Sequence, residues 1–197
     1  MLGREYGGEQ ANLTAEQIAS LTIEGRGGRP REAGNPDVVL GASIHEGVWV
    51  SAKTGQPIHV RMDLPGSAAG ARMPRPTARV FTGAAADTDV VAFTTADGAA
   101  WLAVAHGPGA PTRFGFTIAL PEGMALEPMP SGGLDFMHPH YGATVGRLYR
   151  PWASDAMFRP LPAEYHVREP AVLTVNVDAA GASYPFVVGV VYGASPR

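Results

Sequence analysis

The chain has 197 residues, a formal net charge of -3, 45% hydrophobic residues and no cysteine. This length and composition indicate one globular domain with a substantial core. The absence of any basic run excludes an electrostatic surface for nucleic acid, and the absence of cysteine excludes disulfides and thiolate chemistry. No stretch approaches the roughly 20 apolar residues that a membrane span requires, and the first residues lack the apolar centre of a signal peptide.

The N-terminal region contains one helix signal. Thr14 stands three residues before Gln17, the spacing of a capping box, and apolar residues follow at helical intervals. A Gly/Arg-rich stretch at 25–31 comes next and reads as linker. We therefore predict a helix and linker in residues 1–35 and a single β-sandwich domain in residues 36–197.

Alternation of apolar and polar residues predicts strands in the rest of the chain. In Ile58–Leu64 every second residue is apolar and the intervening ones are polar. The other strands that we expect lie near Val48–Val50, Ala78–Phe81, Asp89–Phe93, Ala100–Val104, Phe114–Leu120, Leu134–Phe136, Val145–Leu148, Leu173–Asp178 and Phe186–Tyr192. About ten short strands separated by Gly and Pro turns predict an all-β fold, an antiparallel β-sandwich or a partly open barrel.

The last two of these strands carry different patterns. Leu173–Asp178 alternates, which indicates a half-buried strand, whereas Phe186–Tyr192 is apolar almost throughout, which indicates a strand covered on both faces. Gly181 and Ser183 lie between them and favour a reverse connection. We therefore expect the two strands to form a β-hairpin.

An ordered series of motifs runs through the second half of the chain. It consists of Ala-Pro-Thr-Arg-Phe-Gly-Phe at 110–116, Leu-Pro-Glu-Gly at 120–123, Pro-Trp-Ala-Ser-Asp-Ala at 151–156, Leu-Thr-Val-Asn-Val-Asp at 173–178 and Tyr-Pro-Phe-Val at 184–187. The series resembles a module of secreted and cell-surface proteins of actinobacteria, which also occurs beside Rhs/YD-repeat and laminin-G-like regions. The chain departs from that pattern at Met157 and Phe158, where the family usually has Asn-Gly.

The resemblance implies an extracellular or cell-surface location and a structural or display role. It carries over no catalytic residue. Our leading hypothesis is therefore a non-catalytic structural module of a secreted or surface-attached bacterial protein, with no cofactor and with a neighbouring protein domain or cell-wall polysaccharide as partner.

Aromatic residues suggest a second hypothesis, a carbohydrate- or cell-wall-binding module. Trp152 follows a proline at an expected bend, and Tyr149 and Tyr165 are close to it in sequence. Aromatic rings of this kind stack on sugar rings in binding sites. The alternative for Trp152 is a buried position in the core or at a corner of the sandwich.

Two histidines suggest a third hypothesis, a metal-dependent enzyme. His138 and His140 are two residues apart, so in an extended segment both rings project to one side and could bind a divalent metal. Asp135, His166 or His106 could supply a third ligand. The alternative is two exposed polar residues in a His-Pro turn.

Overall fold

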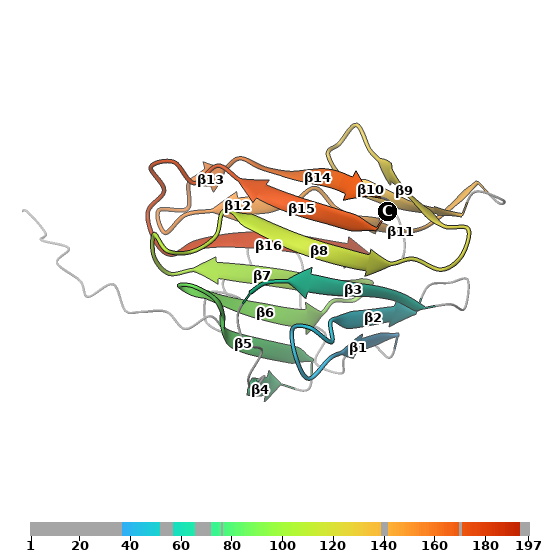
Figure 1. The fold of residues 1–197 in the computed structure, drawn as a ribbon, viewed down its shortest axis with the longest axis horizontal. Coiled ribbons are helices and arrows are strands. Elements are labelled where there is room, and N and C mark those ends of the chain that lie inside the picture. The colour runs from blue at the N-terminus through green and yellow to red at the C-terminus, as the bar shows by residue number, and fades with distance from the viewer. Residues whose placement is uncertain are drawn as a thin grey trace, which may run out of the picture.

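The computed structural model describes residues 37–51, 57–65, 72–75, 77–138, 142–169 and 171–193. These residues form sixteen β-strands in two antiparallel sheets that face each other, and they contain no helix (Figure 1). The prediction of an all-β sandwich is confirmed. The helix and linker predicted within residues 1–35 lie outside the described residues. Among the described residues, no helix has the length and apolarity needed to cross a membrane.

The first sheet has six strands. Its spatial order is β1 (Val38–Leu40), β2 (Val48–Ser51), β3 (Pro57–Asp63), β8 (Arg113–Ala119), β15 (Val172–Val177) and β14 (Ala163–Glu169). The second sheet has ten strands. Its main path is β4 (Arg72–Arg75), β5 (Ala78–Ala85), β6 (Thr88–Thr94), β7 (Gly98–Ala105), β16 (Phe186–Gly193), β11 (Ala143–Leu148), β10 (Leu134–His138) and β9 (Ala125–Pro128), and β12 (Trp152–Ser154) joins β13 (Pro160–Leu161) to β16.

The core between the sheets is built from the alternating strands. Strands β3, β8 and β15 each place every second side chain in the interior, as the sequence pattern predicts. The buried side chains of these three strands are Ile58, Val60, Met62, Phe114, Phe116, Ile118, Leu173, Val175 and Val177. Full burial of one such side chain contributes about 1.5–3 kcal/mol, so this layer supplies much of the stability of the domain.

The two central strands of the ten-stranded sheet are buried on both faces. Every residue of β7 is buried, and all but one residue of β16. On the inner face, Trp101 packs edge-on against Phe116 with ring centroids 6.2 Å apart. On the outer face, side chains including Leu102 and Val187 form a second apolar cluster. The prediction that Phe186–Tyr192 is covered on both faces is confirmed.

The predicted C-terminal hairpin is wrong. Strand β15 pairs with β8 and β14, whereas β16 pairs with β7 in the opposite sheet. Residues 178–185 therefore cross from one sheet to the other, through a cis peptide bond between Tyr184 and Pro185. Alternation and turn residues indicate where strands and turns lie, but not which edge a strand joins. Here both edges of β15 are filled by strands other than its successor.

Candidate functional site

A polar pocket of about 350 Å³ lies at one end of the six-stranded sheet. Its lining residues come from the starts of β8 and β14, the end of β15 and the segment that leads into β12. Figure 1 shows the arrangement of these strands. Two backbone hydrogen bonds fix this end, because Val177 N–H donates to the Thr112 carbonyl at 2.9 Å and Asp178 N–H donates to the Pro162 carbonyl at 3.0 Å. The lining residues are Thr112, Arg113, Arg150, Pro162, Ala163, Glu164, Asn176, Val177 and Asp178.

Three polar side chains of the pocket form a row across the sheet. Arg113 is paired in register with Asn176, and Asn176 is paired with Glu164. Directly opposed residues project from the same face of a sheet, with Cβ atoms about 4.5–5.5 Å apart. Their neighbours Phe114 and Val175 point into the core, so the row faces outward. The asparagine separates the positive end of the row from the negative end.

The charged groups of the pocket differ in what they bind. Glu164 accepts a hydrogen bond from His166 at 2.8 Å, and Asp178 accepts one from the backbone N–H of Ala180 at 3.1 Å. Within the described part of the chain, the guanidinium groups of Arg113 and Arg150 make neither a hydrogen bond nor an ion pair. The pocket therefore offers two cations with unused donors.

Arg150 is positioned by contacts on both sides of its backbone. The hydroxyl of Tyr165 donates to the carbonyl of Tyr149, one residue before Arg150, at 2.9 Å. The aliphatic part of Arg150 runs along Gly132, where an added Cβ would lie 3.3 Å from the arginine Cγ. Burial raises the pKa of Tyr165, so its hydroxyl stays protonated and remains a donor.

The three aromatic residues that the sequence suggested as a ligand platform lie in two places. Tyr165 packs against the core between the sheets. Trp152 packs with the outer cluster of the ten-stranded sheet, and a methyl group on Gly189 would overlap its ring. Tyr149 covers Gly193 in the same way, with its Cε2 3.0 Å from where a Cβ would stand. The platform hypothesis missed the two arginines, because 37 positions of sequence separate them.

The predicted metal ligands are only partly within the described residues. Asp135 binds Arg147 through both carboxylate oxygens, at 2.5 and 3.0 Å, and this contact raises the pKa of Arg147. Thr144 contacts both Asp135 and Met137, which places these two residues on one face of β10 and the next residue, His138, on the other.

His140 lies outside the described residues. The two other candidates are paired with carboxylates, His106 with Asp89 at 3.0 Å and His166 with Glu164 at 2.8 Å. Among the described residues, no three His, Asp or Glu side chains are grouped so that they could hold a metal ion. The metal hypothesis therefore depends on His138 and His140.

A second feature, which the sequence did not suggest as a site, is the turn between β12 and β13. The buried carboxylate of Asp155 accepts five hydrogen bonds. The donors are Met157 N–H (2.9 Å), Arg159 N–H (3.0 Å), Arg159 Nε (2.9 Å), Arg159 Nη2 (2.6 Å) and Ser183 N–H (3.2 Å). The Arg159 side chain and, after it, the backbone donors lower the pKa of Asp155 to about 2. The turn is thus fixed to the segment that crosses between the sheets.

The tip of this turn is apolar. Met157 is 63% exposed and Phe158 is 85% exposed. Phe158 has a φ of 59°, a left-handed conformation that costs a residue with a Cβ about 1–2 kcal/mol. The hydrogen bonds to Asp155 therefore hold a large apolar side chain in solvent on a strained backbone. Backbone strain of this kind is concentrated at functional sites.

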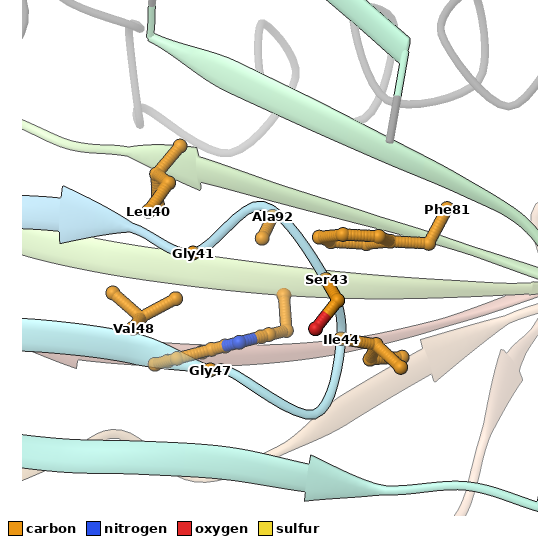
Figure 2. A pocket seen from close by; sticks show the side chains of 9 residues that line it. Leu40, Gly41, Ser43, Ile44, Gly47, Val48, Phe81 and Ala92 are labelled. Atoms are coloured by element: carbon orange, nitrogen blue, oxygen red, sulfur yellow. The ribbon is translucent and has the colours of Figure 1, made fainter. Parts of the chain in front are cut away.

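A small crevice between the sheets lies under the loop at residues 41–47 (Figure 2). Leu40, Val48, Phe81 and Ala92 point toward it, and Ser43 supplies a hydroxyl. Its volume of about 10 Å³ is about that of one water-sized probe, so it is a packing defect and not a ligand site.

Comparison of the chain with family models, with curated proteins and with solved structures found no match.

Proposed function

We propose that the chain is a non-catalytic display module of a secreted or surface-attached bacterial protein, and that the turn at Met157 and Phe158 is what it displays. The observation that carries this proposal is the five-bond support of Asp155 beneath an exposed apolar tip. A turn that is already fixed loses little conformational entropy when it binds, so a small apolar contact suffices to form a specific interaction.

The partner that fits this tip is a shallow apolar pocket on a neighbouring protein domain. The turn itself has two exposed large apolar side chains, Met157 and Phe158, which is too little area for stable insertion into a lipid surface. The cation beside them, Arg159, is bound to Asp155, and the net charge of -3 does not favour an anionic membrane. Aromatic residues that enter a partner's pocket dominate many protein interfaces.

Surface retention in the producing bacterium tests the proposal. The epitope-tagged protein is fractionated between cytosol, cell surface and medium, and we expect the wild type in the surface fraction. Phe158→Asp is expected to release most of it into the medium, because a charged group replaces the apolar contact. Val39→Asp is the matched control, since Val39 is also an exposed large apolar residue but lies on edge strand β1.

Two results would overturn the proposal. A protein confined to the cytosol would contradict the extracellular location. Equal retention of the Phe158→Asp and wild-type proteins, at unchanged melting temperature, would contradict the role of the turn.

A second function, binding of a carbohydrate, is favoured by a different observation, the polar pocket with two arginines that have no hydrogen-bond or ion-pair partner among the described residues. A module that binds cell-wall polysaccharide is compatible with display on a cell surface.

A further inference from the structure

We infer that the polar pocket binds a sugar acid, a ligand that combines a carboxylate with several hydroxyl groups, as in the units of an acidic polysaccharide. The pocket volume of about 350 Å³ lies at the lower end of the range for small-molecule sites. It therefore suits one or two sugar units better than a larger ligand. The pocket is open, so a sugar unit could enter it while still part of a longer chain.

The carboxylate of the ligand is assigned to Arg113 and Arg150. Glu164 and Asp178 line the same pocket but bind His166 and the Ala180 N–H instead of the arginines. Asn176 stands between Arg113 and Glu164 in the cross-strand row. The row spans two strand spacings, about 10 Å, so its two ends do not meet. Among the described residues the guanidinium donors are therefore unused, and the planar carboxylate of a ligand matches their geometry.

The hydroxyl groups of the ligand are assigned to the rest of the pocket. The Asn176 amide both donates and accepts hydrogen bonds, the Thr112 hydroxyl does the same, and the Glu164 and Asp178 carboxylates accept. This mixture fits a ring that carries several hydroxyl groups. It does not fit a free phosphate, because the two carboxylates would repel a compact dianion.

Arg150 owes its position to Tyr165, which makes that buried tyrosine a positioning residue. Its hydroxyl holds the carbonyl of Tyr149, and loss of this bond frees the backbone just before the arginine. The two roles are separated in space, since Tyr165 packs against the core of the sandwich and the two arginines are exposed at the pocket.

Calorimetric titration of the full chain with trigalacturonic acid tests the inference. The matched ligand is its methyl ester, which has the same ring hydroxyls but no charge. We expect the acid to bind and the ester to bind at least about tenfold more weakly, a difference of about 1.4 kcal/mol. Binding of the acid should also weaken as salt is raised, because the site is open to solvent.

Three variants locate the site. Arg113→Gln and Arg150→Gln are each expected to weaken binding of the acid about tenfold or more. Arg168→Gln is the control and is expected to leave the dissociation constant within about twofold, since Arg168 is an exposed arginine of β14 that does not line the pocket. Thermal melts confirm that each variant is folded.

Several results would overturn the inference. They are absence of binding by the acid, equal binding of acid and ester, an equal loss in Arg168→Gln, and binding of inorganic phosphate as tight as that of the acid. The inference is independent of the displayed turn. Phe158→Asp is expected to keep full affinity for trigalacturonic acid even where it abolishes surface retention.

Discussion

The contact between Trp152 and Gly189 gives a prediction that decides what the tryptophan does. In the structure its ring covers the outer face of β16, where a methyl group on Gly189 would overlap the ring atoms Cε2, Cζ2 and Nε1. The two residues are directly paired across the strands, so neither backbone can shift without disturbing the sheet. We expect Gly189→Ala to lower the free energy of unfolding by about 1–3 kcal/mol, the usual cost of overpacking.

Urea unfolding followed by circular dichroism measures this loss, and a thermal melt should fall by about 2–4 °C for each kcal/mol in a chain of this length. Gly115→Ala is the matched control in another strand. Its Cβ would lie 3.4 Å from atoms of Asp63, an ordinary contact. The control is expected to change the free energy of unfolding by less than about 0.5 kcal/mol.

A double-mutant cycle completes the test. Trp152→Ala removes the ring, so adding Gly189→Ala to it should cost little, and the two changes should couple by at least about 1 kcal/mol. Additive effects, or a Gly189→Ala protein as stable as the wild type, would refute the packing argument. Either result would leave Trp152 available as the exposed sugar-stacking residue that the sequence suggested.

Three further predictions concern the turn and the pocket. Asp155 has a pKa of about 2, below the ordinary 3.8, so its ionised form adds stability that is complete above about pH 4 and is lost as pH falls to 2. The free energy of unfolding measured from pH 5 to 2 should show this decline. Asp155→Asn, which is less stable at pH 7, should show a flatter decline. Tyr165→Phe leaves the carbonyl of Tyr149 without its donor and should lower the free energy of unfolding by about 0.5–1.5 kcal/mol in urea, and no change would mean that water replaces the hydroxyl. Phe158→Gly relieves about 1–2 kcal/mol of backbone strain at an entropic cost of about 0.5–1 kcal/mol, so the melting temperature should rise while surface retention falls. A lower melting temperature would contradict the claim that the backbone at Phe158 is strained.

The sequence predicted the strands of this protein better than their pairing. All ten expected strands are present, because alternation marks half-buried strands such as β3, β8 and β15, and short apolar runs mark strands buried on both faces such as β7 and β16. Most of those missed, such as β12 and β13, have only two to four residues, too few for a period to be visible. Strand β14 is longer and does alternate, with Ala163 and Tyr165 directed inward. Its alternation is visible in the sequence, although the strands expected from the sequence do not include it.

The candidate site was much less accessible to sequence analysis. Arg113 and Arg150 line one pocket because β15 joins β8 to β14, and Tyr165 of β14 in turn binds the carbonyl of Tyr149, next to Arg150. No spacing in the sequence carries that information. The turn at Asp155 is better indicated by the sequence, since Met157 and Phe158 depart from the Asn-Gly of the family pattern. The sequence does not show which groups donate hydrogen bonds to the Asp155 carboxylate, because one of them, the Ser183 N–H, comes from a distant segment.

The position of β16 in the ten-stranded sheet affects how the chain folds during its synthesis. In the described residues, this strand alone connects the group β4–β7 to the group β9–β13. Until residues 186–193 have been made, β7 has an unpaired edge and the two groups have no hydrogen bonds between them. Unpaired edges of this kind promote association with other chains. The nascent protein is therefore more prone to associate with other chains until β16 inserts beside β7.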